Sequence, residues 1–165
     1  MATYYQAQVS EDQLEQSREQ VEREGRKQAM RVSFWEEHRG IFGEKWSVHV
    51  MNRSPDPVRG VVLTLNVDNA PTSRPLMLHS LGPCTETVIQ GKDLLDGLSF
   101  IRATKMTLRA DALLFTDRDG ANWRRTDEQL TRSGDIPKEL MAPQWHLLLD
   151  TEAPTVKKMG ACDEG

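Results

Sequence analysis

The sequence has few of the features that mark specialised classes of protein. Only two of its 165 residues are cysteines, Cys84 and Cys162, and neither they nor the four histidines have the close spacing of zinc ligands. No apolar run approaches the roughly 20 residues needed to cross a bilayer. The stretch MATYYQAQVSEDQ lacks the basic and apolar regions of a secretory signal. We therefore expect a soluble, cytoplasmic protein with two free thiols, no metal and no membrane partner.

Positive charge is also in short supply. The chain has 21 Lys and Arg against 25 Asp and Glu, so its formal net charge is −4. A protein that binds nucleic acid needs a positive field. The two short basic pairs, Arg124-Arg125 and Lys157-Lys158, are too small to supply one. We expect no nucleic-acid partner.

Motifs of catalysis are absent as well. The sequence has no G-x-S-x-G elbow, no H-E-x-x-H zinc motif and no phosphate-binding P-loop. Ser80, His79 and Asp111 have the residue types of a catalytic triad, and Cys84 with His49 those of a thiol pair, but geometry defines such sites. We predict that the chain is not an enzyme, needs no cofactor, and has no catalytic, cofactor-binding or metal-binding residue.

What the sequence does contain begins with a charged helix. Ser10 and Gln13 have the spacing of a capping box, and Val9 can pack on Leu14 as a hydrophobic staple, so a helix is predicted from about residue 10 to residue 30. Acidic residues fill its early turns and basic residues its later turns. This order suits the helix dipole.

The apolar stripe of this helix is thin. Leu14 and Val21 lie seven residues apart, but the intervening positions that a coiled coil requires are polar, and Gly25 weakens the helix. Little of the helix is expected to be buried in its own domain. It is either a solvated helix leaning on that domain, or a helix that pairs with a partner or a second copy, or a frayed segment. If it pairs, Leu14 and Val21 are the partner-binding residues.

Between residues 31 and 130 the apolar period changes from 3.6 to 2, which is typical of strands. Turns rich in proline and glycine separate the apolar segments. This pattern predicts a mainly β fold, an antiparallel β-sandwich. The seven predicted strands are RVSFW, WSVHVMN, VVLTLNV, LMLHSL, TETVI, MTLRADALLF and NWRR.

The stretch FTDRDGANW, residues 115–123, raises the question of a calcium loop. Counting from Asp117 places Ala121 where an oxygen ligand is needed, and the glycine falls at position 4 instead of 6. As a hairpin, the stretch needs only a polar loop that tolerates positive φ at Gly120. We predict a turn, with Phe115 and Trp123 paired across the two strands.

The tail, residues 131–165, contains the compact apolar run QWHLLLD. In an extended segment, Trp145, Leu147 and Leu149 share one face. This face requires burial, either against the domain's own sheet edge or against another chain. We expect the run to add to a sheet edge and assign Trp145, Leu147 and Leu149 to partner binding. The stretch TEAPTVKKMGACDEG is predicted to be a flexible end.

Three stretches together carry a resemblance: WSVHVMNRSPDPVRGVVLTLNV, SLGPCTETV and ADALLFTDRDGANWRR, followed by Gln129-Leu130. They resemble the immunoglobulin-like module common in uncharacterised actinobacterial proteins, which a charged helix commonly precedes. The resemblance covers roughly residues 32 to 130 and implies an immunoglobulin-like antiparallel β-sandwich. It implies no specific function. The Cys…Trp…Cys spacing of antibody domains is missing, so no disulfide-pinned sandwich is implied.

The expected organisation is a charged helix at 1–30, an immunoglobulin-like β-sandwich at 31–130 and a C-terminal docking tail at 131–165. We predict a non-catalytic protein–protein interaction module, an adaptor or assembly subunit that binds another protein through helix and tail, in a homo-oligomer or a larger assembly. The alternative is small-molecule or carbohydrate binding by the loops at one end of the sandwich. Removal of the helix or the tail should abolish partner binding if the protein is an adaptor, but it should not abolish ligand binding by the loops.

Overall fold

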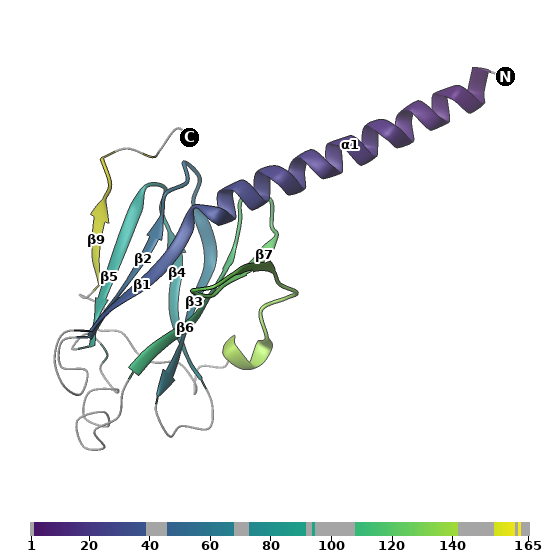
Figure 1. The fold of residues 1–165 in the computed structure, drawn as a ribbon. Coiled ribbons are helices and arrows are strands. Elements are labelled where there is room, and N and C mark those ends of the chain that lie inside the picture. The colour runs from purple at the N-terminus through teal and green to yellow at the C-terminus, as the bar shows by residue number, and fades with distance from the viewer. Residues whose placement is uncertain are drawn as a thin grey trace.

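The computed structural model describes residues 2–38, 46–67, 73–91, 94, 108–141, 154–160 and 162. One long helix leads into a series of strands (Figure 1). Within the described residues no helix is long and apolar enough to span a membrane. The elements are α1 (Ala2–Met30), β1 (Val32–His38), β2 (Trp46–Asn52), β3 (Val58–Val67), β4 (Arg74–Leu81), β5 (Thr85–Gln90), β6 (Leu108–Thr116), β7 (Asn122–Arg125), β8 (Leu130–Arg132), the 3₁₀ turn η3 (Lys138–Met141) and β9 (Thr155–Lys158).

The strands form two antiparallel sheets that face each other as a β-sandwich. The order in one sheet is β1-β2-β5-β9, and the order in the other is β4-β3-β6-β7-β8. The prediction of a mainly β fold with one N-terminal helix is confirmed. Each of the seven predicted strands has a counterpart, and β8 and β9 are additional.

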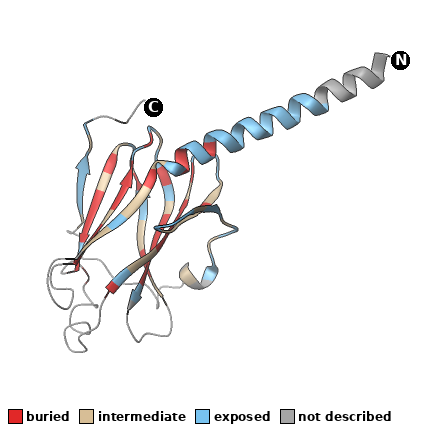
Figure 2. Ribbon diagram, viewed as in Figure 1, coloured by how far each residue is buried: buried red, intermediate tan, exposed pale blue. Residues whose placement is uncertain are grey.

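The core lies between the two sheets (Figure 2). In β2 the alternation of the sequence puts Trp46, Val48 and Val50 inside. Phe115 and Trp123 pair across β6 and β7, and both are buried, as predicted. Strand β3 departs from simple alternation because Val61 to Leu65 are buried without interruption. Both faces of β3 are therefore buried over these five residues.

Helix α1 begins earlier than predicted and projects away from the sandwich (Figure 1). Residues 11–24 are exposed on every side, and the expectation of little burial is confirmed for them (Figure 2). The expectation is wrong for the last turn. Gly25, Gln28 and Ala29 are buried there, and Ala29 belongs to the hydrophobic core. Gly25 and Ala29 let the helix approach the sandwich closely because they have little or no side chain.

The C-terminal tail corrects two predictions. Residues 155–158 were expected to be flexible, but they form β9, which pairs antiparallel with the free edge of β5. The cysteines were expected to be free thiols, but Cys84 and Cys162 form a disulfide, with their Cα atoms 5.2 Å apart. The main-chain N–H of Met159 also donates to the carbonyl of Cys84 at 2.8 Å. Main-chain pairing sets this register, so the polar side chains of the tail did not reveal it.

The run QWHLLLD, with Trp145, Leu147 and Leu149, lies outside the described residues. Its assignment to partner binding stays a prediction. The strand that the tail does add to a sheet edge, β9, comes later in the chain than the run for which this pairing was predicted.

Candidate functional site

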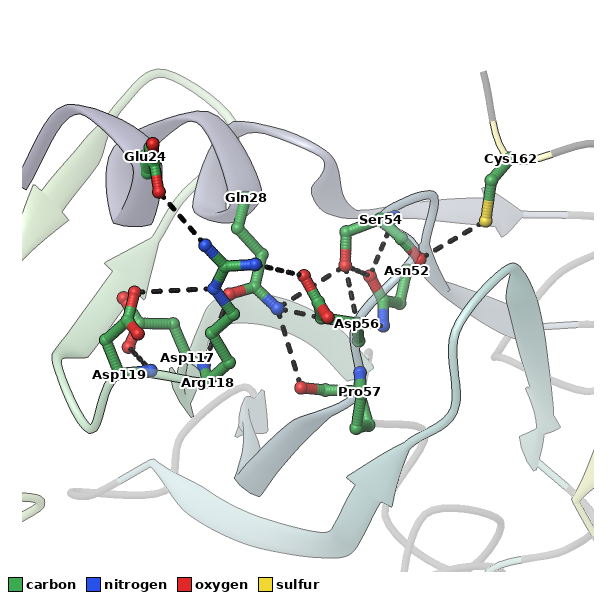
Figure 3. Close-up of polar contacts among 10 residues, drawn as sticks. All are labelled: Glu24, Gln28, Asn52, Ser54, Asp56, Pro57, Asp117, Arg118, Asp119 and Cys162. Carbon is green, nitrogen blue, oxygen red and sulfur yellow. Dashed lines mark hydrogen bonds and ion pairs between the residues drawn. The ribbon is translucent and has the colours of Figure 1, made fainter. Parts of the chain in front are cut away.

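The side-chain amide of Gln28 holds the last turn of α1 among the turns of the sandwich (Figure 3). Its Nε2 group donates to Ser54 Oγ at 3.5 Å, and to the carbonyls of Asp56 at 3.4 Å and Pro57 at 3.5 Å. Its Oε1 accepts a hydrogen bond from the main-chain N–H of Arg118 at 3.2 Å. Burying an amide is costly unless both of its ends are bonded. Gln28 meets this condition by joining the helix to two turns that are far apart in the sequence.

Asn52 ties one of these turns to the turn between β4 and β5. Its Nδ2 group donates to the carbonyls of Asp56 and Gly82, both at 2.9 Å. Its Oδ1 accepts from the N–H of Ser54 at 3.0 Å, and the carbonyl of Ser54 accepts from the N–H of Cys84 at 3.2 Å. Asn-x-Ser is also the acceptor pattern for N-linked glycans. Asn52 is fully buried, so in the folded protein its role is structural.

Asp117 organises the turn between β6 and β7. Its Oδ1 accepts from the main-chain N–H groups of Asp119 at 2.9 Å and Ala121 at 2.8 Å. Its Oδ2 accepts from the indole Nε1 of Trp123 at 2.8 Å, and Gly120 has the positive φ of 85° that such a turn requires. The prediction of a hairpin turn is confirmed. Within the part of the chain that the structure describes, no group of three or more His, Cys, Asp or Glu residues could hold a metal ion.

Gly25 lies against this turn. A Cβ atom at Gly25 would come within 2.9 Å of Asp117 Oδ2, closer than such atoms approach each other in proteins. The sequence presents this glycine as a weak point in the helix. In the structure it is the position where only a residue without a side chain lets the helix rest on the buried carboxylate.

Arg118 adds an outer ring of charge to the same junction (Figure 3). Its guanidinium lies 3.0 Å from Asp56, 3.1 Å from Glu24 and 3.5 Å from Asp119. The carboxylates of Asp56 and then Asp119 raise the pKa of Arg118 above its ordinary value. The guanidinium links the helix, the turn after β2 and the turn after β6 at the surface.

An open groove of about 360 Å³ lies between the helix and the sandwich, next to this junction. Val21 lines it from the helix, and Ala121 and Trp123 line it from the hairpin. Arg132 of β8 reaches back to Glu22 of the helix at 3.5 Å, so the groove has charged side chains at its rim. Its other lining residues are Ser17, Arg18, Gly25, Asp117 and Asp119.

The two helix residues that were predicted to bind a partner, Leu14 and Val21, are both exposed, by 54% and 50%. At about 100° per residue they share one helix face with Gly25 and Gln28. The face that is buried at the base of the helix therefore continues outward as an uncovered apolar stripe.

A separate cluster lies on the sheet that contains β1, β2 and β5. Trp35 stacks on His49 with ring centroids 4.7 Å apart, and His49 Nδ1 lies 2.6 Å from Glu86 Oε1. The second ring nitrogen of His49 lies 3.8 Å from Glu37. Since Cys84 is in the disulfide, it offers no thiol to His49. Cross-strand contacts account for this cluster.

Sequence reasoning missed the residues that make the junction. Gln28, Asn52 and Asp117 are polar residues in ordinary contexts, and their burial depends on turns brought together by the fold. The one available signal was Gly25, whose presence in the middle of a charged helix has no local benefit.

Compared with known proteins, the chain matches no family, and no curated protein and no solved structure shows significant similarity to it.

Proposed function

We propose that this protein is a non-catalytic interaction module, an adaptor or assembly subunit that binds another protein through the exposed length of α1. The observation that carries the proposal is that one face of the helix is buried at one end and exposed along the rest. At its base this face is buried on the sandwich, and further out Leu14 and Val21 extend it into solvent. The tail residues Trp145, Leu147 and Leu149 are proposed as a second contact.

The junction supports this role because it holds the helix in a defined direction. Gln28 bonds to two turns, and Arg118 links the helix to both of them from outside. Helix α1 is 29 residues long, which corresponds to about 44 Å. A helix that is firmly seated at one end and bare at the other can be presented to a partner without a large loss of conformational freedom on binding.

We also propose that the sandwich is immunoglobulin-like. The order β1-β2-β5 in one sheet and β3-β6-β7 in the other supports this class, with β4 beside β3. The additional strands β8 and β9 extend each sheet by one. The sequence led us to expect a cytoplasmic location, because it lacks a secretory signal and a membrane-spanning run, and to expect two free thiols. The bond between Cys84 and Cys162 favours an oxidising compartment instead, and we propose that location.

Site-specific photo-crosslinking in the native host tests the role of the helix. A photoreactive residue at Val21 should give an adduct of one defined mass, and excess wild-type protein should compete with it. The same residue at Arg23, on the opposite helix face, is the control. Excess Val21→Asp protein should fail to compete. Equal adducts from both faces, or none from either, would contradict the proposal.

A further inference from the structure

The strand β9 covers the edge of β5 without adding to the core. Its four residues, Thr155–Lys158, are all exposed, and each lies opposite one residue of β5. No residue of the described tail, 154–160 and 162, belongs to the hydrophobic core. Ordering a residue costs about as much free energy as one main-chain hydrogen bond returns. Because no apolar burial is added to this balance, the ladder by itself does not hold β9 in place.

The disulfide between Cys84 and Cys162 therefore supplies the attachment. Beside it, the main-chain N–H of Met159 donates to the carbonyl of Cys84, and Cys162 Sγ lies 3.3 Å from the carbonyl of Ser54. Both cysteines are partly exposed, so a thiol in solution can approach the bond. The one strong link between the tail and the sandwich is thus also the link that a change of redox state can break.

Strand β5 does not depend on β9 for its own position. All six of its residues pair with β2 on the other side. Thr87, Val88 and Ile89 are buried, and Ile89 belongs to the core. Loss of β9 therefore leaves β5 in its sheet, with one row of main-chain N–H and C=O groups uncovered.

The uncovered edge is a good template for another strand. The sequence of β5, TETVIQ, is rich in β-branched residues and contains no lysine, proline or glycine. Strand β9, by contrast, places Lys157 and Lys158 at the outside of the sheet. Lysine on an edge strand hinders pairing with a further strand, and an edge without lysine or proline invites it. The tail therefore converts a receptive edge into a protected one.

We propose that β9 is a redox-controlled cover of a strand-binding edge on β5. While the disulfide is closed, the tail occupies the edge. A dithiol reductant opens it: one thiolate attacks a sulfur of the bond and releases the other cysteine, and its second thiol then releases the first. Two electrons and two protons pass to Cys84 and Cys162, and the reductant becomes a disulfide. The freed edge accepts an extended strand of another chain in antiparallel pairing.

The register of β9 indicates which strands fit this edge. Lys157 lies opposite Glu86, and Val156 lies opposite Thr87. Opposite charges and β-branched residues at directly facing positions stabilise antiparallel pairs. The partner is therefore an extended segment with a basic residue opposite Glu86 and a β-branched residue opposite Thr87. This surface is separate from the helix, so the inference does not rest on the proposed function.

Limited trypsin digestion of the full chain, oxidised and after treatment with dithiothreitol, tests the release of β9. Reduction should speed cleavage after Lys157 and Lys158 at least about tenfold, because a detached strand is open to the protease. Lys138, an exposed residue of η3, is the matched control, and its cleavage should change less than about twofold. Circular dichroism should show that the reduced protein keeps its strands at the temperature of the digestion.

Capture of a peptide tests the uncovered edge. The full-length Cys162→Ser protein carries a free Cys84 thiol, and the probe is the peptide PTVKKMGAC, residues 154–162, with its cysteine linked to thionitrobenzoate. Cys84 attacks the peptide sulfur, a protein–peptide disulfide forms, and thionitrobenzoate leaves as a thiolate whose absorbance is measured. A control peptide with Thr155→Pro and Val156→Pro keeps the cysteine and the charges but loses ladder donors. It should react at least about tenfold more slowly.

Unchanged cleavage after Lys157 on reduction would show that the ladder alone holds β9, and it overturns the inference. A reduced protein that loses its fold also overturns it, because the release is then not local. Equal capture of the two peptides rules out strand binding at the β5 edge. None of these results changes what photo-crosslinking at Val21 measures, so this inference and the proposed function fail separately.

Discussion

The two terminal segments of the chain are attached to the sandwich in opposite ways. The base of α1 is attached by burial: Gly25, Gln28 and Ala29 are buried, and the side-chain amide of Gln28 makes the polar contacts. All four residues of β9 are exposed. Its attachment consists of a main-chain ladder to β5 and of the disulfide between Cys84 and Cys162.

Both attachments meet at the turn after β2. The hydroxyl of Ser54 accepts a hydrogen bond from the side-chain amide of Gln28 (Figure 3). The carbonyl of Ser54 accepts a hydrogen bond from the main-chain N–H of Cys84. The Sγ atom of Cys162 lies 3.3 Å from the same carbonyl. The turn after β2, which Asn52 holds in place, therefore contacts both segments. The base of α1 is attached by buried side chains, and the segment with β9 depends on the disulfide. The difference predicts how each attachment will fail.

Removal of the disulfide should have the largest effect. The bond closes a separation of 78 residues, and chain entropy assigns such a crosslink about 4.5 kcal/mol. The double variant Cys84→Ser with Cys162→Ser should melt about 9–18 °C lower. Calorimetry measures the shift, and hydrogen exchange should show β9 exchanging faster while α1 is unchanged. A wild type that melts at the same temperature after complete reduction would refute the covalent attachment.

Asp117→Ala should be the next largest change. The carboxylate accepts three hydrogen bonds, and its loss leaves the buried indole N–H of Trp123 without an acceptor. We expect a loss of about 3 kcal/mol in the free energy of unfolding. Urea unfolding measures it. Asp119→Ala, in the same turn but exposed, is the matched control and should cost much less. Similar losses for the two variants would mean that burial is not the cause.

Gly25→Ala should lower the stability of the protein, although glycine-to-alanine changes in helices usually raise it. In an exposed helix this substitution gains about 1 kcal/mol. Here the added Cβ collides with Asp117, so we expect a loss of about 1–2 kcal/mol. Gln16→Ala, at an exposed position of the same helix, should change stability by only a few tenths of a kcal/mol. A stabilised Gly25→Ala protein would show that the helix does not rest on the turn.

Arg118→Ala should have the smallest effect, below about 1 kcal/mol, because its ion pairs are exposed and screened by salt. The main-chain bond to Gln28 survives in this variant. The pKa of Arg118 is raised, so its contribution is fully present below the ordinary arginine pKa and should stay constant between pH 7 and about pH 10. Thermal unfolding of the two proteins over this range checks it; a difference that shrinks toward pH 10 contradicts it.

Much of the fold could be predicted because it follows from local patterns. The alternation in WSVHVMN gives β2, and the polar loop with Gly120 gives the hairpin of β6 and β7. The candidate site was less accessible. The spacing of Leu14 and Val21 identified them as candidate partner-binding residues. The buried base of the helix could not be identified in this way, because Gln28 and Ala29 are residue types that also occur on exposed helices.

The sequence by itself determined the strands, the hairpin around Asp117 and the charged helix, because these depend on periods of two and 3.6 residues and on turn chemistry. Only the tertiary structure decided the burial of Gln28, the need for glycine at position 25, the strand β9 and the bond between Cys84 and Cys162. Each of these depends on groups that are far apart in the chain. Contacts of this kind are created by the packing of the two sheets, and no local pattern records them.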